Sequence, residues 1–118
     1  MARKVLIVDD IQADRNHLER IVSEAGHQTL LAENGNMAFE RAKRDQPDLI
    51  LMDVNMPEVD GFAATRMLKA DEATKNIPVV FVSAKNQKAD MAWGQMLGAK
   101  GYITKPYSRE QILAQLAA

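Results

Sequence analysis

Five polar residues lie at the ends of four short apolar runs, and together they have the chemistry of a phosphoryl-binding site. Asp9 and Asp10 follow the run at 5–8, Asp53 follows 49–52, Ser83 follows 79–82, and Lys105 follows a weaker run at 101–104. Neighbouring carboxylates repel one another unless a cation joins them, and oxygen ligands suit a hard ion such as Mg²⁺. A hydroxyl, an ammonium and Mg²⁺ would offset the charge of a phosphoryl group, with one aspartate as its nucleophile.

Each of these residues also has an ordinary structural explanation. A single Asp after a strand is most often a turn or helix cap, Ser83 could cap a helix, and Lys105 could be a solvated loop lysine. The functional interpretation is favoured because these residues follow apolar runs whose ends a parallel sheet would bring together. The two histidines, His17 and His27, show no partner pattern, and we expect a helix-surface residue and a loop residue respectively.

The apolar runs predict the elements that would position these residues. Continuous apolar runs, rather than alternating ones, are typical of parallel strands covered on both faces, and they occur at 5–8, 29–32, 49–52, 79–82 and 101–104. Helical spacing of apolar residues predicts helices over 14–25 and around 38–42, 62–68, 89–97 and 108–116, with Gly26 and Ser108 as end signals. This alternation predicts an α/β fold with a doubly wound parallel sheet.

Length and composition exclude several classes of protein. A chain of 118 residues without a linker or repeat is expected to form a single domain over 1–118, with no output domain. The absence of cysteine excludes a disulfide scaffold, a Cys-ligated zinc site and thiol catalysis. A net charge of −1 argues against nucleic-acid binding, and the lengths of the apolar runs lead us to expect neither a membrane span nor a signal peptide. We therefore expect a cytoplasmic protein.

Four segments resemble the response-regulator receiver domain, and the resemblance covers essentially the whole chain. They are VLIVDD at 5–10, DLILMDVNMP at 48–57 with DG at 60–61, PVVFVSA at 78–84 and GAKGYITKP at 98–106. The resemblance implies a CheY-like, flavodoxin-like fold with five strands in the order 2-1-3-4-5 and five flanking helices. It also implies a stand-alone response regulator of a two-component phosphorelay, which acts as a phosphoacceptor switch and not as a turnover enzyme.

The resemblance assigns roles to the acidic residues one by one. Asp53 would be the phosphoacceptor. Mg²⁺ would be held by the carboxylates of Asp10 and Asp53 and by the backbone carbonyl of Asn55, while Asp9 would act largely through water.

The remaining assignments concern the response to phosphorylation. Ser83 and Lys105 would contact the phosphoryl oxygens, and the peptide bond between Lys105 and Pro106 would be cis. Ser83 and Tyr102 would form the switch: the hydroxyl moves toward the phosphoryl group, and the aromatic ring swings toward the core.

Residues of the predicted fourth helix could form the surface that a partner recognises. Trp93 lies four residues before Leu97, so we expect it in the core, whereas Met91 and Gln95 lie off that apolar stripe. Met91, Gln95 and Tyr102 are therefore the predicted partner face. Gly94 would either soften a helix that shifts or allow close packing.

A narrower resemblance points to a signalling system. The segments KNQ at 85–87, WG at 93–94 and AATR at 63–66 are similar to the single-domain PilH/PilG-type receivers of type IV pilus chemosensory systems. This similarity implies a role in twitching motility or chemotaxis, a histidine kinase of the CheA type as phosphodonor, a downstream protein target and a monomeric state.

Four alternatives to an output switch are compatible with parts of the sequence. The protein could be a phosphate sink that drains a shared kinase. An aspartyl phosphatase of the haloacid dehalogenase type needs an acid two residues after its nucleophile, where this chain has Asn55. A flavin-binding protein would need a phosphate loop after the first strand, where Asp9 and Asp10 would repel the phosphate. The intact set of site residues argues against a degenerate receiver.

Overall fold

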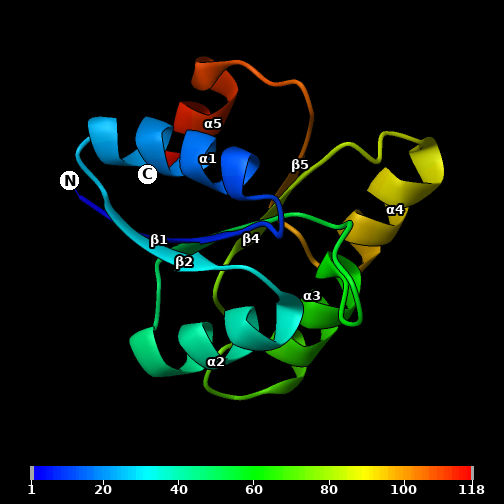
Figure 1. The fold of residues 1–118 in the computed structure, drawn as a ribbon. Coiled ribbons are helices and arrows are strands. Elements are labelled where there is room, and N and C mark those ends of the chain that lie inside the picture. The colour runs from blue at the N-terminus through cyan, green and yellow to red at the C-terminus, as the bar shows by residue number, and fades with distance from the viewer. Residues whose placement is uncertain (1, 118) are drawn as a thin grey trace.

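A parallel sheet lies between two layers of helices in the computed structural model, which describes residues 2–117 (Figure 1). The strands are β1 (Lys4–Val8), β2 (Gln28–Ala32), β3 (Leu49–Met52), β4 (Val79–Ser83) and β5 (Gly101–Thr104). The helices are α1 (Gln12–Glu24), α2 (Gly35–Asp45), α3 (Gly61–Ala70), α4 (Lys88–Met96) and α5 (Arg109–Leu116).

The sheet has the strand order β2-β1-β3-β4-β5, and all neighbouring strands are parallel. β1 lies beside both β2 and β3, and the direction of the strand order reverses there. The doubly wound five-stranded fold predicted from the sequence is therefore confirmed. In such sheets the carboxyl ends of the strands around the reversal form the usual ligand site.

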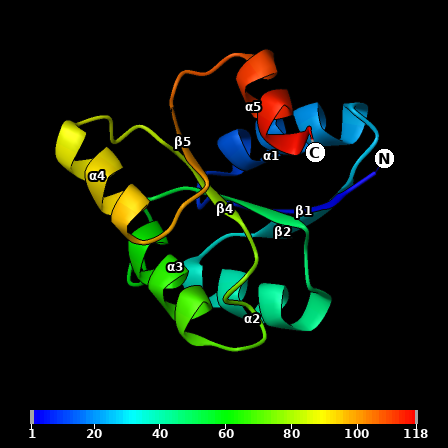
Figure 2. The same cartoon turned by 180° about the vertical axis from the view of Figure 1, so that it is seen from behind.

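Alternate residues of the central strands supply two separate cores. Leu6 and Val8 face the layer of α2 and α3, whereas Val5 and Ile7 face α1 and α5. Both views show α1 and α5 on one face of the sheet and α2 and α3 on the other (Figures 1 and 2). β3, β4 and residues 5–8 of β1 are buried because they are covered on both faces, which explains their continuous apolar sequences, whereas the edge strands β2 and β5 are partly exposed.

Local capping explains where several helices begin and end. The side chains of Asn34, Asp60 and Ser108 accept hydrogen bonds from backbone N–H groups in the first turns of α2, α3 and α5. Gly26 follows α1 with a φ of +92°, the left-handed conformation that favours glycine at this position. α1 begins at Gln12, earlier than the expected start at residue 14. Within residues 2–117, no helix is both long and apolar enough to cross a membrane.

The helix α4 is held against the sheet differently from the way the sequence predicts. A Cβ atom at Gly94 would lie 3.1 Å from a ring carbon of Phe81 and 3.2 Å from one of Tyr102. Gly94 is the buried residue of α4, so the explanation by close packing is confirmed. The prediction that Trp93 lies in the core is wrong: its exposed fraction is 37%, and the guanidinium of Arg66 stacks 5.7 Å from its ring.

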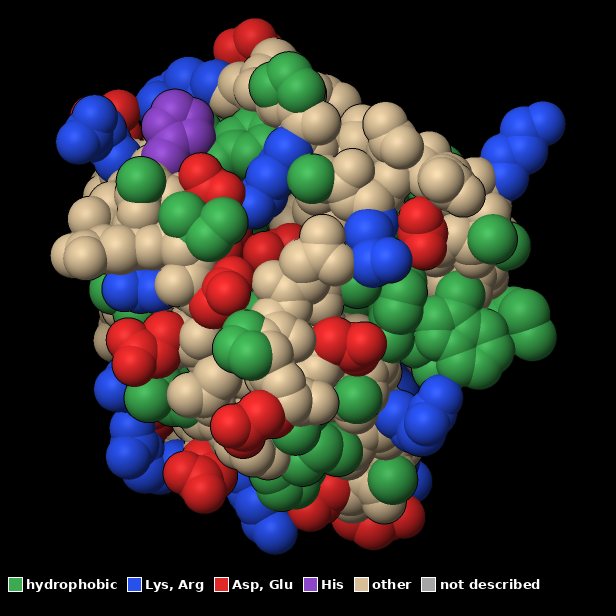
Figure 3. Space-filling model, turned by 45° about the vertical axis from the view of Figure 1, so that its right-hand side comes forward, with side chains coloured by type: hydrophobic (Ala, Val, Ile, Leu, Met, Phe, Trp, Pro, Cys, Tyr) green, Lys and Arg blue, Asp and Glu red, His purple; other side chains and the backbone are tan. Residues whose placement is uncertain are grey.

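The exposed surface of α4 is unusually apolar. Met91 and Met96 are also exposed, Met96 to 77%. Figure 3 shows hydrophobic side chains gathered along one edge of the molecule, with Lys and Arg side chains above and below them.

Candidate functional site

The pairing of β1 with β3 brings two acidic residues to the same level of the sheet. Val8 lies opposite Met52, and the N–H group of Asp53 continues the ladder by donating to the carbonyl of Val8 at 2.9 Å. The N–H group of Asp9 donates to the carbonyl of Ala32 at 3.2 Å. Asp9 and Asp53 therefore leave neighbouring strands side by side, because the hydrogen bonds of the sheet extend through both residues.

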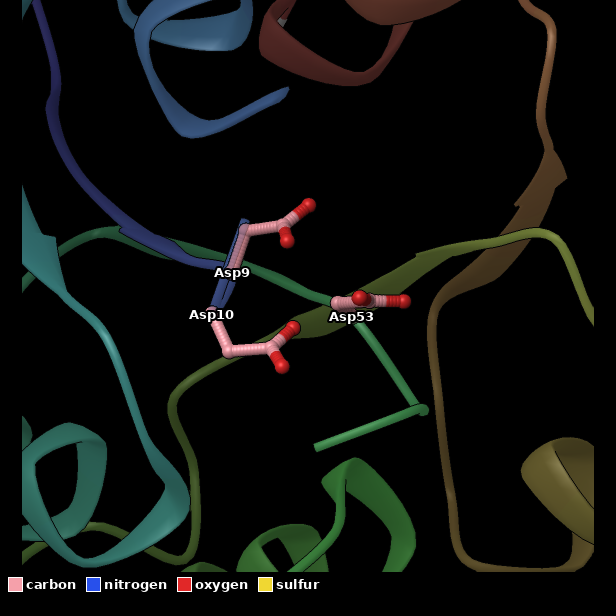
Figure 4. A group of neighbouring side chains, drawn as sticks. All are labelled: Asp9, Asp10 and Asp53. Carbon is pink, nitrogen blue, oxygen red and sulfur yellow. The ribbon is translucent and has the colours of Figure 1, made fainter. Parts of the chain in front are cut away.

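Asp9, Asp10 and Asp53 form one acidic cluster (Figure 4). One carboxylate oxygen from each residue lies within 4.8 Å of the other two. Asp9 and Asp53 are buried, to 0% and 3% exposure, while Asp10 is exposed at the rim. Three carboxylates at this spacing form an oxygen-rich site of the kind that binds Mg²⁺ through one or two carboxylates and water.

Burial makes the carboxylate of Asp53 unusually basic. Loss of solvent raises its pKa to about 6, and the charge of Asp9 acts in the same direction. Lys105, the N–H group of Val54 and the hydroxyl of Ser83 favour the charged form and oppose this rise. The N–H group of Val54 donates to Oδ1 of Asp53 at 2.8 Å, which leaves Oδ2 toward Lys105.

The ammonium of Lys105 lies between three carboxylates. Its Nζ donates to Oδ2 of Asp14 at 2.8 Å and to Oδ2 of Asp9 at 2.9 Å, and it lies 3.8 Å from Oδ2 of Asp53. Burial lowers the pKa of Lys105, but the hydrogen bonds to Asp14 and Asp9 and the charge of Asp53 outweigh this effect, so the pKa is raised overall. The ammonium therefore remains charged and offsets part of the acidic cluster. The peptide bond from Lys105 to Pro106 is cis.

Ser83 ends β4 and is fully buried. Its Oγ accepts a hydrogen bond from the N–H group of Lys85 at 3.2 Å, and the carbonyl of Lys85 accepts one from the hydroxyl of Tyr102 at 2.7 Å. The ring of Tyr102 packs against Phe81 with 5.8 Å between centroids. Burial, and to a lesser degree the charge of Asp90, raises the pKa of Tyr102.

The loop after β3 passes close to the acidic cluster because of a glycine. The N–H group of Gly61 donates to the carbonyl of Val54 at 2.9 Å, and a Cβ at Gly61 would lie only 2.1 Å from the carbonyl oxygen of Asp53. No residue with a side chain fits this position without moving the backbone of Asp53. Asn55 lies in the same loop and is exposed.

The structure brings Asp9, Asp10, Asp53 and Lys105 together, as the sequence predicts. Met91 and Gln95 lie exposed on α4, while Tyr102 is half-buried. Sequence reasoning missed Asp14, which binds the ammonium of Lys105 from the first turn of α1. The available signal was its position: an acid one turn after the Asp9-Asp10 pair lies above the same edge of the sheet.

Comparison with known proteins identifies the family. The profile of the response regulator receiver domain matches residues 5–117. The chain belongs to the response regulator receiver domain family. It is 43% identical over 118 residues to the protein PilH of Pseudomonas aeruginosa, an alignment that covers 100% of this chain and 97% of PilH.

Solved structures share the fold of this chain. Chemotaxis protein CheY4 of Vibrio cholerae superposes with a TM-score of 0.91 at 28% identity, covering 98% of this chain and 97% of CheY4. The receiver domain of a sensor histidine kinase from Pseudomonas aeruginosa PAO1 gives a TM-score of 0.90 at 28% identity, covering 98% and 95%. That structure has a magnesium ion coordinated in its active-site cleft.

Receiver domains act as switches that accept a phosphoryl group on an aspartate from a histidine kinase, and they bind Mg²⁺ at their acidic site. The cluster of this receiver fits such an ion. It offers three carboxylate oxygens within 4.8 Å of one another, and the nearby ammonium of Lys105 offsets only part of their charge.

Proposed function

We propose that this receiver acts as a stand-alone response regulator, which its match to 97% of the length of PilH supports, and that it accepts a phosphoryl group on Asp53. The observation that carries this proposal is the place of Asp53, beside Asp9 and Asp10 and 3.8 Å from the ammonium of Lys105. The raised pKa of Asp53 also supports a nucleophilic role, because a more basic carboxylate is a better nucleophile.

Transfer from a kinase phosphohistidine needs an in-line approach and little other chemistry from the protein. An oxygen of Asp53 forms a bond to phosphorus as the N–P bond breaks, and the imidazole leaves with the bonding electron pair. When bound, Mg²⁺ would neutralise part of the negative charge of the phosphoryl group. The carboxylates of Asp10 and Asp53, the backbone carbonyl of Asn55 and, through water, Asp9 would hold the ion.

The same residues would stabilise the product. The ammonium of Lys105 would bind one phosphoryl oxygen, and the hydroxyl of Ser83 would donate to another. Ser83 can donate its proton while its Oγ still accepts from the N–H group of Lys85, because a hydroxyl serves as both donor and acceptor. A movement of Ser83 would therefore be passed to Lys85 and from there to Tyr102.

The partner face would consist of Met91, Gln95 and Tyr102. Met91 and Gln95 are exposed on α4, and Tyr102 joins this helix to the loop that follows Ser83. A monomeric protein with such a face would deliver its signal by contact with a downstream protein. The alternative is a phosphate sink, in which rapid loss of the phosphoryl group replaces recognition by a target.

The signalling system is inferred from the similarity to PilH. An identity of 43% across the whole chain favours a role in twitching motility or chemosensory control, with a histidine kinase of the CheA type as donor. Because such kinases draw their phosphoryl group from ATP, we infer that the protein works in the cytoplasm.

The test is phosphotransfer from purified kinases charged with labelled ATP. A CheA-type kinase from a pilus system should pass label to the wild type within seconds in Mg²⁺, and an unrelated histidine kinase should do so much more slowly. Equal rates from both kinases would contradict the pilus assignment. A label lost within seconds, with no protein that binds the phosphorylated form preferentially, would favour the sink.

A further inference from the structure

Asp14 binds the ammonium of Lys105 although it lies outside the acidic cluster. It stands in the first turn of α1, and its Oδ2 accepts a 2.8 Å hydrogen bond from Nζ of Lys105. The same Nζ donates to Asp9 at 2.9 Å. Two of the three N–H donors of the ammonium are therefore committed to carboxylates other than Asp53, whose nearest oxygen lies at 3.8 Å.

The three carboxylates around Lys105 differ in burial. The side chains of Asp9 and Asp53 are 1% and 4% exposed, whereas that of Asp14 is 39% exposed. A buried carboxylate that loses its cation is left as an uncompensated charge, which is costly. Asp14 can instead be hydrated when it releases the ammonium, so it is the partner that Lys105 can leave most readily.

We propose that Asp14 is a positioning residue that holds the ammonium of Lys105 away from Asp53 until a phosphoryl group competes for it. This inference rests on the proposed role of Asp53 as phosphoacceptor. A phosphoryl group adds charge and three strong acceptor oxygens next to an ammonium only 3.8 Å away. Lys105 then exchanges Asp14 for a phosphoryl oxygen and keeps its bond to the buried Asp9.

Asp14 therefore stabilises the unphosphorylated form. It competes for the ammonium that the phosphoryl group needs, and its negative charge repels that group at short range. Removal of the charge of Asp14 should end both the competition for the ammonium and the repulsion of the phosphoryl group, and so favour the phosphorylated form. If Asp14 interacted only with the dipole of α1, its removal would not change the balance between the unphosphorylated and phosphorylated forms.

The affinity for beryllofluoride, a phosphoryl mimic that binds receiver aspartates, tests the proposal. It is measured by ¹⁹F NMR titration in saturating Mg²⁺ for the wild type and for Asp14→Asn. The variant should bind about three- to tenfold more tightly, the range expected for loss of one competing charged hydrogen bond in a partly exposed pair. Asp14→Ala should show the same gain, and it excludes a new hydrogen bond from the amide as the cause.

Two control variants separate positioning from charge. Asp14→Glu keeps the carboxylate and should bind within about twofold of the wild type. Glu24→Gln removes the same charge from the other end of α1, where Glu24 pairs with Arg109 at 3.0 Å, and it should also leave the affinity within about twofold. Equal or weaker binding by both Asp14→Asn and Asp14→Ala would overturn the proposal.

Failure of the proposed function gives a different result. If Asp53 is not the phosphoacceptor, the wild type will bind beryllofluoride no better than Asp53→Asn, and both proposals fall. If the wild type binds and Asp53→Asn does not, the function stands, and the variants of Asp14 alone decide the positioning role.

Discussion

The hydroxyl of Tyr102 donates a 2.7 Å hydrogen bond to the backbone carbonyl of Lys85, whose N–H group donates to Oγ of Ser83. The backbone of one loop residue thus joins the end of β4, next to the acidic cluster, to the aromatic ring that packs below α4. Any shift of Ser83 toward Asp53 must move Lys85 or break one of these two bonds. This is a short physical route from the candidate phosphorylation site to the predicted partner face.

Tyr102→Phe should loosen this route while the site is retained. The variant keeps the ring against Phe81 but loses one hydrogen bond of about 1 kcal/mol, so the amides of residues 84–87 should exchange about fivefold faster. Addition of beryllofluoride and Mg²⁺ should protect these amides less than in the wild type. Hydrogen exchange followed by mass spectrometry measures both effects.

Tyr107→Phe is the matched control for that experiment. Tyr107 packs against His17, at 5.7 Å between centroids, and it is not part of the route through Lys85. Its variant should exchange residues 84–87 at the wild-type rate. If Tyr102→Phe behaves in the same way as this control, Tyr102 is a packing residue and the switch uses another path.

Mg²⁺ should stabilise the folded protein, because only the folded state brings the three repelling carboxylates close enough to bind the ion. At ten times its Kd the ion should contribute about 1.4 kcal/mol, a rise in Tm of roughly 4 to 8 °C. Asp10→Asn should raise the Tm of the metal-free protein and abolish most of the rise with Mg²⁺. A metal-free Asp10→Asn that melts below the wild type would show that Asp10 acts as a structural cap.

The raised pKa of Asp53 predicts how the stability of the metal-free protein depends on pH. Between pH 4 and 6 the folded state binds a proton at Asp53 that the unfolded state has already released, so the free energy of unfolding falls as the pH rises through about 6. In EDTA, Asp53→Asn should remove most of this fall and be more stable than the wild type at pH 7.5 by about 1 kcal/mol. Chemical denaturation at several pH values measures it.

Asp71→Ala provides a contrast of opposite sign. The N–H group of Ala73 and the ammonium of Lys43 lower the pKa of Asp71. The contribution of Asp71 to stability is therefore present at neutral pH and is lost as the pH falls below the ordinary pKa of an aspartate. This variant should be less stable than the wild type at pH 7.5.

The raised pKa of Asp53 would be refuted by either of two results: a wild type whose stability does not fall between pH 5 and 7, or an Asp53→Asn variant that is less stable than the wild type at pH 7.5.

Gly61→Ala should damage the site through the backbone. The added methyl group would lie 2.1 Å from the carbonyl oxygen of Asp53, so the loop must move, at a cost of about 1–3 kcal/mol. Gly101→Ala is the control, because the atoms nearest to its methyl group belong to the flexible end of the Gln115 side chain, at 3.4 Å. Urea denaturation should separate the two variants clearly. A Gly61→Ala as stable as Gly101→Ala would show that the β3–α3 loop is not held closely against Asp53.

Most of the fold could be predicted from the sequence, because one physical requirement governs it. Strands covered on both faces need continuous apolar runs, and the five runs correspond to the five strands. Helix ends could also be predicted, because they depend on residues next to them in the sequence: Gly26 supplies a positive φ after α1, and Ser108 caps the first turn of α5. The acidic cluster followed because parallel strands deliver the residues after them to one edge.

What could not be predicted depends on distances between elements. The spacing of Trp93 and Leu97 suggested a buried stripe, yet Gly94 is the residue that lets α4 approach Phe81, and this rotates Trp93 outward. The bond from Asp14 to Lys105 depends on how α1 lies relative to the end of β5, across 91 positions of sequence. The position of Asp14 one turn after Asp9 and Asp10 indicates that it lies at this edge of the sheet, but it does not indicate that Lys105 is its partner.

The identity of the phosphorylated residue decides whether Asp53 is the phosphoacceptor. The protein is phosphorylated with a charged kinase in Mg²⁺ and treated with borohydride, which reduces an aspartyl phosphate to homoserine, and the modified residue is located by mass spectrometry. We predict homoserine at position 53, and none there in Asp53→Asn or after chelation of Mg²⁺ with EDTA. Homoserine at position 9 or 10, or phosphate retained on Ser83 or a histidine, would show that Asp53 is not the phosphoacceptor.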